Sequence, residues 1–565
     1  MDYFLTKVDK LVTGTLSEWD RLSTTLFILS ICSIVYFIIY TREPDTHPLF
    51  LERQTQASPV RQKGESAIFR SHSAPHGTAL ISGLNIRNPG DSKWTHGKDG
   101  DLRDIWKRAI TGAQDRLGND LGKTGKLFTL QGTSEVIEHD LNEITKQISS
   151  IGHYLKKNQS KRVAIYLPNS VEFLASLFAC AFHESIAILL KYDQSPTSLL
   201  SQLERAKADT VITASGSFPF DLILEQYSEL KQLVFVVDEG SKHIDWKEVP
   251  VGLNNDLNIS TWHEIVQSRE SSTEAKFLSY DSSTDLKPVI VFTAEEMVEF
   301  TQENIIAGIA GQLTSVPSSQ IFTPSDLFLP IDCLSAIYPL TLTLAALFSN
   351  ADIALTAVAS HSPSLTTAVR GISPTVIAAS STTMIRFHDE TKKELSSPLY
   401  SLVHWLEERC LTRKGYMPTA SVLSSVFKNL YPIIGNAPGK LRLIYISSLV
   451  GVDKPISSLI LSDLRIFIKS RIIYALTAPQ VAGAVSQTGV FDYRLGELPN
   501  MAHFGAPVTS LELYFQDKGE YRNTDFASCG EIIVNGPAVV GGKARLRVVG
   551  MMNRDLTLRL LESSS

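Results

Sequence analysis

Apolar and polar positions alternate with two periods along most of this chain. Residues 140–157 repeat apolar side chains every three or four positions, which is helical spacing. The run 162–167 (Arg-Val-Ala-Ile-Tyr-Leu) is typical of a buried strand, and residues 171–182 are typical of a helix that follows it. The alternation continues with a helix at 201–208 and strands at 210–213 and 234–238. Strands separated by helices predict an α/β fold with mostly parallel sheets covered by helices.

One apolar run is long enough to cross a bilayer. Residues 22–40 carry no charge and are bordered by Arg21 and Arg42. About 20 apolar residues span the hydrocarbon layer, so the run predicts a single transmembrane anchor. A cleaved signal peptide is the alternative, but acidic residues precede the run and no small-residue cleavage site follows it. Two other apolar stretches, 173–190 and 337–355, are interrupted by polar residues and are predicted to be buried helices leading into strands.

These patterns divide the chain into five parts. Residues 1–21 form an amino-terminal flank and 22–40 the anchor. Residues 41–100 are rich in Pro, Ser, Gly, His and Arg, and are predicted to lie as an extended arm or polar linker. Residues 101–545 carry the folded α/β domain, and 546–565 form a residual tail.

Charge, cysteine usage and motifs narrow the classes of function. The formal net charge is −6 over 565 residues without a dense basic block, so no nucleic-acid partner is expected. The 5 cysteines are scattered without a C-x-x-C pair, which argues against a disulfide framework and a zinc site and favours a body facing the cytosol. No hydrolase, metalloprotease or P-loop motif stands in a suitable context.

The segment 289–308 contains a buried strand without a phosphate-binding loop after it. Thr293 ends the strand, and Thr293 and Glu296 have the spacing of a capping box, so the strand is predicted to turn directly into a helix. No Gly or Lys stands between Thr293 and Gly308, and three glutamates at 295, 296 and 299 would repel a polyphosphate. An ordinary capped helix is the favoured interpretation, and a shortened but working nucleotide loop is the alternative.

Several segments, taken in order, resemble the adenylate-forming (AMP-binding) superfamily, and in particular long-chain acyl-CoA synthetases. The resemblance covers roughly residues 125–545 and rests on 162–190, 199–213, 326–330, 372–376, 504–508 and 529–537. It implies the superfamily's amino-terminal α/β subdomains with a small β subdomain, and ATP-dependent acyl adenylation as the ancestral chemistry. Fold resemblance alone is only an analogy for function.

The elements that the resemblance assigns to the nucleotide are altered in this chain. Of the family's T-S-G-T-T-G-x-P-K-G loop only Thr293 remains. The Y-G-x-T-E element reads Tyr474-Ala475-Leu476-Thr477-Ala478, so Tyr474 and Thr477 match while Ala478 replaces the magnesium-binding carboxylate. Thr293, Tyr474 and Thr477 are therefore the candidate residues of a vestigial nucleotide-like pocket. An ordinary strand end explains Tyr474 and Thr477 equally well.

Further family elements are missing towards the carboxyl end. Leu449 and Val450 fill space that the family leaves open for the purine, and no ribose-binding T-G-D stands within 541–547. Arg554 and Asp555 faintly resemble the family's hinge, but the small domain with its catalytic lysine does not follow. Lys543 could replace that lysine, although a surface lysine is the simpler interpretation. We therefore predict no catalytic residue, no metal ligand and no cofactor.

The sequence as a whole predicts a membrane-anchored, acyl-CoA synthetase-like pseudoenzyme. It would act as a scaffold, a regulator or a lipid-binding module at the endoplasmic reticulum or another cytosol-facing organelle membrane. The expected partners are the lipid bilayer, a fatty acyl ligand held in a retained apolar cavity, and a protein partner. The alternative is an active long-chain fatty acid–CoA ligase with divergent motifs, which would use ATP, Mg²⁺ and CoA. A third interpretation is a decayed or mispredicted chain whose true carboxyl end is missing.

Overall fold

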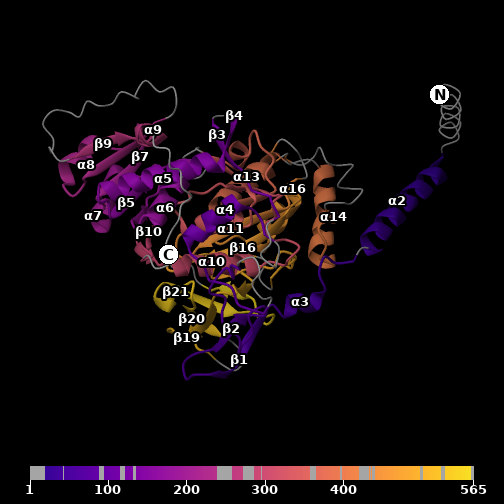
Figure 1. The fold of residues 1–565 in the computed structure, drawn as a ribbon. Coiled ribbons are helices and arrows are strands. Elements are labelled where there is room, and N and C mark those ends of the chain that lie inside the picture. The colour runs from indigo at the N-terminus through magenta and orange to yellow at the C-terminus, as the bar shows by residue number, and fades with distance from the viewer. Residues whose placement is uncertain are drawn as a thin grey trace, which may run out of the picture.

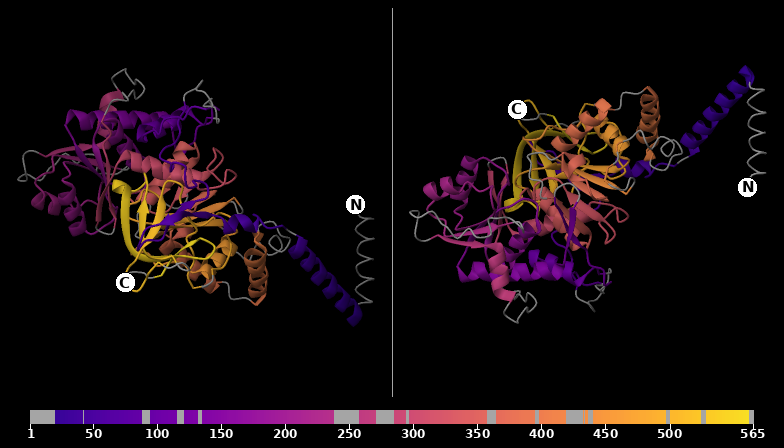
Figure 2. Two further views of the ribbon diagram at one scale, coloured as in Figure 1. Left: turned by 90° about the horizontal axis from the view of Figure 1, so that it is seen from below. Right: turned by 90° about the horizontal axis from the view of Figure 1, so that it is seen from above.

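Three β-sheets organise the part of the chain that the computed structural model describes (Figures 1 and 2). That part comprises residues 20–41, 43–87, 94–114, 121–131, 135–237, 257–270, 285–293, 296–356, 364–394, 398–418, 432, 434–435, 440–496, 500–523 and 528–561. Two of the sheets are mainly parallel and packed with helices, and the third is antiparallel. The predicted α/β fold with mostly parallel sheets is confirmed.

The first large sheet has 7 strands in the order β11-β10-β6-β5-β7-β8-β9, and only the pair β10–β11 is antiparallel. Its strands are β5 (Arg162–Tyr166), β6 (Ile186–Leu189), β7 (Thr210–Ala214), β8 (Gln232–Val236), β9 (Asn258–Thr261), β10 (Val289–Thr293) and β11 (Glu296–Phe300). One core joins this sheet to α5 (Leu141–Lys157), α6 (Val171–Phe182) and α9 (Trp262–Glu270). A second core joins it to α7 (Pro196–Ala206) and α8 (Phe220–Gln226).

The second large sheet has 9 strands in the order β18-β17-β16-β15-β14-β12-β13-β3-β4, and it is parallel from β16 to β3. Its strands are β3 (Leu127–Gln131), β4 (Glu135–His139), β12 (Leu327–Pro330), β13 (Asp352–Thr356), β14 (Val376–Ser380), β15 (Leu443–Leu449), β16 (Arg471–Thr477), β17 (Ser486–Gln487) and β18 (Ala506–Pro507). Its helices are α4 (Leu102–Thr111), α10 (Gln302–Thr314), α11 (Ile337–Phe348), α12 (Leu365–Ala368), α13 (Ser381–Glu394), α14 (Pro398–Lys414) and α16 (Ser458–Ile468).

The third sheet is antiparallel, with 6 strands in the order β1-β2-β19-β20-β21-β22. Its strands are β1 (Thr55–Arg61), β2 (Ala67–Ser71), β19 (Glu512–Gln516), β20 (Cys529–Asn535), β21 (Lys543–Met552) and β22 (Leu558–Leu560). The 3₁₀ turn η3 (Val540–Gly542) precedes β21. The strands of this sheet therefore come from both ends of the chain, as the indigo and yellow ribbons of Figure 1 show.

Helices α6 and α11 lie in the main core and explain the two interrupted apolar stretches. Nearly every residue of both helices is buried, including Phe173, Phe178 and Leu344 at 0% exposure. A helix that is apolar on all sides is stable only when it is enclosed on all sides. Here α4 packs against both helices, with the rings of Trp106 and Phe178 centred 5.0 Å apart. The predicted buried helices are confirmed.

The prediction that the chain turns directly from strand to helix at Thr293 is wrong. Strand β11 pairs antiparallel with β10 over five residue pairs, the last of which joins Thr293 to Glu296. Val298 and Phe300 point into the core while Glu299 between them is exposed, so the period-two pattern of residues 298–300 overrides the apparent helix cap. The helix α10 starts after Thr301, which forms a true capping box with Asn304.

The stretch 41–100 is an arm on the folded body rather than a linker wherever it is described. Strand β2 pairs with β19, and Phe69 of β2 is 2% exposed with its ring 5.8 Å from that of Phe515. The edge strand β1 contains Pro59, which suits an edge because proline cannot donate a ladder hydrogen bond. Asp45 fixes the start of the arm, since its carboxylate accepts from the Tyr493 hydroxyl at 2.8 Å.

Residues 21–41 form a helix, α2 (Arg21–Thr41), which extends away from the body (Figures 1 and 2). Its described apolar side chains are exposed, with Leu22 at 66% and Leu29 at 65%. The side chains at 35 and 37–41 lie outside the described residues. Among the residues that are described, no helix combines the length and the apolar character that crossing a membrane requires.

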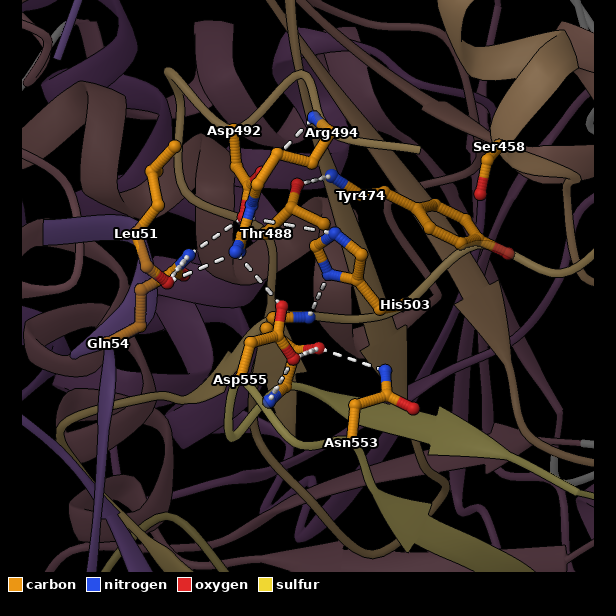
Figure 3. Close-up of polar contacts among 12 residues, drawn as sticks. Leu51, Gln54, Ser458, Tyr474, Thr488, Asp492, Arg494, His503, Asn553 and Asp555 are labelled. Carbon is orange, nitrogen blue, oxygen red and sulfur yellow. Dashed lines mark hydrogen bonds and ion pairs between the residues drawn. The ribbon is translucent and has the colours of Figure 1, made fainter. Parts of the chain in front are cut away.

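Asp492 is the buried centre of a polar network (Figure 3). Its side chain has 0% exposure, and its carboxylate lies 2.8 Å from Arg494, 2.7 Å from the Gln54 amide and 3.8 Å from His503 Nε2. Burial opposes ionisation of Asp492, but hydrogen bonds from Arg494 and Gln54 and the positive charge nearby lower its pKa to about 2. Asp492 is therefore a buried carboxylate that depends on these partners.

Arg494 extends this network to the arm and to the final hairpin. Its guanidinium donates to the carbonyl oxygen of Leu51 at 3.2 Å and lies 3.1 Å from the Asp555 carboxylate (Figure 3). Asp555 stands in the turn that connects β21 to β22. Gln54 and Asp492 are 438 positions apart, so the network fastens distant parts of the chain to each other.

Asp463 of α16 joins α13 and α14 through two histidines. Its carboxylate lies 3.1 Å from His388 Nε2 and 3.1 Å from His404 Nε2, while His388 Nδ1 faces Asp389 at 3.0 Å. Burial opposes ionisation of Asp463, but the hydrogen bonds from both histidines lower its pKa to about 2. Burial alone would lower the pKa of His388, whereas its bonds to Asp463 and Asp389 raise it above the ordinary value.

Replacing Asp492 with Asn is expected to destabilise the fold. Removing one partner of a buried ion pair costs about 3–5 kcal/mol, and we expect the lower end because Arg494 is 29% exposed and keeps Asp555. The urea midpoint of unfolding measures the loss. The control is Glu138→Gln, which breaks an exposed pair with Lys126 and should cost about 0–1 kcal/mol. Equal midpoints for the two variants would refute the role of Asp492.

Stability is also expected to depend on pH through His388. Because its pKa is raised in the folded state, its contribution is complete below the unfolded value of about 6.5 and is lost as pH rises through the folded pKa. The thermal unfolding midpoint of the wild type should therefore fall more steeply as pH rises above about 6.5 than that of His388→Gln. Parallel pH profiles would contradict this assignment.

Candidate functional site

A small pocket lies where the three sheets meet. It is lined by Glu296 of β11, by residues 450–451 after β15, by residues 479–480 after β16, and by residues 545–548 of β21. The carboxyl ends of parallel strands are the usual place for ligands in such sheets. The pocket has a volume of about 100 Å³, whereas pockets for drug-sized ligands usually measure about 300–1,000 Å³.

The β10–β11 hairpin closes one side of the pocket. Only Ala294 and Glu295 separate the paired residues Thr293 and Glu296, and these two lie outside the described residues. Glu296 then reaches across to the nine-stranded sheet, where its Oε1 accepts from Gln480 Nε2 at 2.9 Å. A phosphate-gripping loop needs several successive backbone N–H groups, and a two-residue connection does not supply them.

Tyr474 is enclosed in the core at the middle of β16. It is 0% exposed, its ring stacks on Phe504 with centroids 4.6 Å apart, and its hydroxyl accepts from the Ile456 backbone N–H at 2.9 Å. Its own N–H donates to Thr488 Oγ1 at 2.9 Å (Figure 3). Burial raises the pKa of Tyr474 to about 12. The polar groups of Tyr474 are thus engaged within the fold, and it does not line the pocket.

Thr477 and Thr293 are likewise not among the residues that line the pocket. Thr477 is 4% exposed, and its hydroxyl donates to the Ser448 carbonyl oxygen at 3.3 Å. Thr293 is half-buried at the end of β10, next to the paired Glu296 that does line the pocket. None of the three predicted residues therefore stands in the pocket wall. Whether they contact a nucleotide stays a prediction.

The positions assigned to purine and magnesium are occupied by apolar side chains. Val450 is 8% exposed and forms part of the pocket wall, and its N–H donates to the Thr477 carbonyl oxygen at 2.9 Å. Ala478 is 1% exposed. Within the described ranges, no three His, Cys, Asp or Glu residues are grouped so that they could hold a metal ion. Valine and alanine at these two positions offer no side-chain oxygen to a ligand.

Arg545 and Arg547 of β21 line the pocket, and the sequence analysis does not predict this position for them. The register of β21 against β20 shifts between Glu531 and Ile533, which marks a β-bulge. Within it, Arg547 has φ +60°, a left-handed conformation that costs a non-glycine residue about 1–2 kcal/mol. Lys543, Arg545 and Arg547 alternate along an exposed strand face. That alternation is visible in the sequence, whereas the bulge is not.

The segment with the faint hinge resemblance folds back onto the body. Arg554 and Asp555 lie in the turn between β21 and β22, and the Thr557 hydroxyl donates to the Asp555 carboxylate at 2.7 Å. Strand β22 pairs with β21, and Leu558 exchanges backbone hydrogen bonds with Phe504 and Gly505 at 2.7 and 2.8 Å. Residues 552–560 therefore form a fixed hairpin.

Comparison with known proteins shows which family and which solved structures this chain is similar to. Residues 138–542 match the family model of the AMP-binding enzyme, while no curated protein matches the chain. VinN in complex with L-aspartate is 12% identical with a TM-score of 0.56, over 82% of this chain and 98% of that one. An anthranilate CoA ligase, AuaEII, in complex with anthranoyl-AMP is 12% identical with a TM-score of 0.56, over 82% and 78%.

The amino-terminal domain of FACL13 from Mycobacterium tuberculosis is also similar, at 11% identity with a TM-score of 0.55, over 82% of this chain and 100% of that domain. Identities this low establish the fold alone. The family model, however, spans more than half of the chain. The chain therefore belongs to the AMP-binding enzyme family.

Proposed function

We propose that this protein is a pseudoenzyme of the AMP-binding family, which acts as a scaffold or regulatory partner without forming acyl adenylates. The observation that carries the proposal is the pairing of β10 with β11 up to Thr293 and Glu296. Typical members of the family are AMP-forming ligases, and their reaction requires that the phosphates of ATP be held. The hairpin leaves no loop to hold them.

The rate that is typically lost with each catalytic group makes residual ligase activity small. Loss of one preorganised electrostatic donor costs about 100- to 1,000-fold in rate. Here the phosphate loop and the metal carboxylate are altered together, and Glu296 adds a negative charge at the pocket wall. Such losses are not additive, but two independent ones already leave little of an ordinary turnover.

An active long-chain fatty acid–CoA ligase with divergent motifs is the second candidate. Membership of the family and the likeness to acyl- and aryl-CoA ligases favour it. It would need ATP, Mg²⁺ and CoA, and a nucleotide would have to enter a pocket of about 100 Å³. The pocket would have to open by displacing Glu296 from Gln480, and for this reason we place this candidate second.

A lipid-binding role would require an acyl cavity between α6 and α11. Most residues of both helices are buried, and α4 packs against both of them. These contacts favour a filled core, so within the proposal the scaffold role stands before the lipid-binding role. Within the proposal a fatty acyl chain would be a bound ligand and not a substrate. Each methylene that it buries would contribute about 0.8 kcal/mol to the free energy of binding.

We further propose that residues 22–40 anchor the protein in the endoplasmic reticulum or another membrane that faces the cytosol. The uncharged sequence of this run and the helical backbone of α2 support the proposal. The described large apolar side chains of α2 are exposed, and water is a poor environment for them. A protein partner that covers α2 would meet the same need.

The full-length protein is expected to show no magnesium-dependent ATP binding. Isothermal titration with Mg-ATP should give only heats of dilution, because the hairpin replaces the phosphate loop. An active AMP-forming ligase titrated under the same conditions serves as the positive control. A saturable, magnesium-dependent site with micromolar affinity would overturn the proposed function.

Deleting residues 1–42 is expected to release the protein from membranes. The deletion ends before Asp45, so the contact between the arm and Tyr493 is kept and the body should remain folded. Sedimentation and carbonate extraction of the two forms measure the effect. A truncated protein that still resists carbonate extraction would rule out a single anchor, and retention that salt removes would indicate a peripheral contact.

A further inference from the structure

The helix α14 turns large apolar side chains and positive charges to solvent. One row of exposed side chains at helical spacing consists of Leu402, Trp405, Arg409 and Arg413. Leu402 is 56% exposed and Trp405 is 48% exposed. Among the described positions of α14, no exposed side chain is acidic. A helix on a soluble body usually turns its apolar side chains inward, so this outward row suits a binding partner.

Trp405 and Arg409 form a pair whose chemistry indicates the kind of partner. The guanidinium carbon of Arg409 lies 4.7 Å from the centre of the Trp405 ring, which is a cation–π distance. Indole rings concentrate at the boundary between water and the acyl chains of a membrane, and basic side chains are attracted to anionic lipid headgroups. A helix face that combines the two is typical of helices that lie on a membrane surface.

The carboxyl end of α14 lies beside the point where the chain leaves α2. The Asp45 N–H donates to the Gly415 carbonyl oxygen at 2.9 Å, and the Met417 N–H donates to the Asp45 carboxylate at 3.3 Å. Asp45 stands four positions after Thr41, the last residue of α2, and four positions span at most about 14 Å. Figures 1 and 2 show α14 and the body end of α2 on one flank of the molecule. A bilayer that held residues 22–40 would therefore begin close to α14.

The short helix α3 (Pro48–Glu52), which follows Asp45 in the chain, adds further exposed apolar side chains. Leu49 is 53% exposed and Phe50 is 71% exposed. The next carbonyl oxygen, that of Leu51, accepts from Arg494 at 3.2 Å, so α3 is fastened to the body. Large apolar side chains are thus exposed on both of the helices that lie nearest to the body end of α2 (Figure 1).

We propose that the exposed faces of α14 and α3 rest on the surface of an anionic bilayer. Trp405 and Phe50 lie at the level of the lipid glycerol groups, and the two arginines of the row contact lipid phosphates and carboxylates. The inference rests on the proposed anchoring by residues 22–40. A few apolar side chains and two positive charges bind a bilayer weakly, so this contact orients the body while the anchor holds the protein.

The emission of Trp405 in vesicles tests the contact. Full-length protein is inserted into phosphatidylcholine vesicles with about 30% phosphatidylserine, made with and without lipids that carry bromine in their acyl chains. Bromine quenches tryptophan on contact, and the difference between wild type and Trp405→Phe gives the emission of Trp405. We expect a shift to shorter wavelength in both vesicles and a loss of intensity in the brominated ones. The matched control is Trp94→Phe: Trp94 is 95% exposed but stands before α4, and its emission should not change.

A double variant tests the arginines. Arg409→Gln combined with Arg413→Gln removes two exposed charges, so the unfolding midpoint should match that of the wild type. Quenching of Trp405 should fall to the level that the wild type shows in pure phosphatidylcholine. The control is Lys156→Gln combined with Lys157→Gln, which removes two exposed charges from the last turn of α5 and should leave the quenching unchanged.

The outcomes separate this inference from the proposed anchor. Full-length protein that carbonate extracts from the vesicles would overturn both. Protein that resists carbonate while Trp405 keeps its intensity in brominated vesicles would overturn the inference alone. A shift to shorter wavelength without quenching would show that a protein, such as a second copy of this chain, covers the face, which contradicts contact with lipid. Quenching that the double variant leaves unchanged would contradict the preference for anionic lipid.

Discussion

Backbone pairing between β10 and β11 continues to Thr293 and Glu296, and the chemistry available to the pocket depends on it. The pairing is itself a consequence of side-chain burial, because Val298 and Phe300 enter the core only when residues 296–300 are extended. Asn304 then fastens the start of α10 to the carbonyl oxygens of Pro537 and Val539, which precede β21. The helix that follows the β10–β11 hairpin is therefore hydrogen-bonded to the segment that leads into β21.

The Asp492 network fixes three distant segments of the chain relative to each other. It holds the amino-terminal arm, the segment after β17 and the β21–β22 turn in one arrangement through Gln54, Arg494 and Asp555. Buried carboxylates are costly unless they are paired, so each partner stabilises the position of the others. The segment that resembles a hinge is thereby part of a rigid turn.

The sequence predicts much of the α/β framework because its signals are local. The helical spacing of 140–157 and the apolar strand 162–167 each differ from α5 and β5 by one residue at one end. The hairpin is missed because Thr293 and Glu296 imitate a helix cap, while the true cap, Thr301 with Asn304, has the same spacing eight residues later. Strand β1 is missed because its sequence is polar, and β2 is missed because its partner β19 lies more than 400 positions away. Likewise, the bulge that positions Arg547 depends on its pairing with β20, which no local pattern encodes.

The central claim is that closure of the β10–β11 hairpin removes adenylate formation from an AMP-binding fold. The most direct measurement is ATP–pyrophosphate exchange by the full-length protein in the presence of a panel of carboxylic acids that includes long-chain fatty acids. The account predicts no exchange above that of a reaction without acid. Acid-dependent exchange that saturates with ATP and requires Mg²⁺ would contradict it.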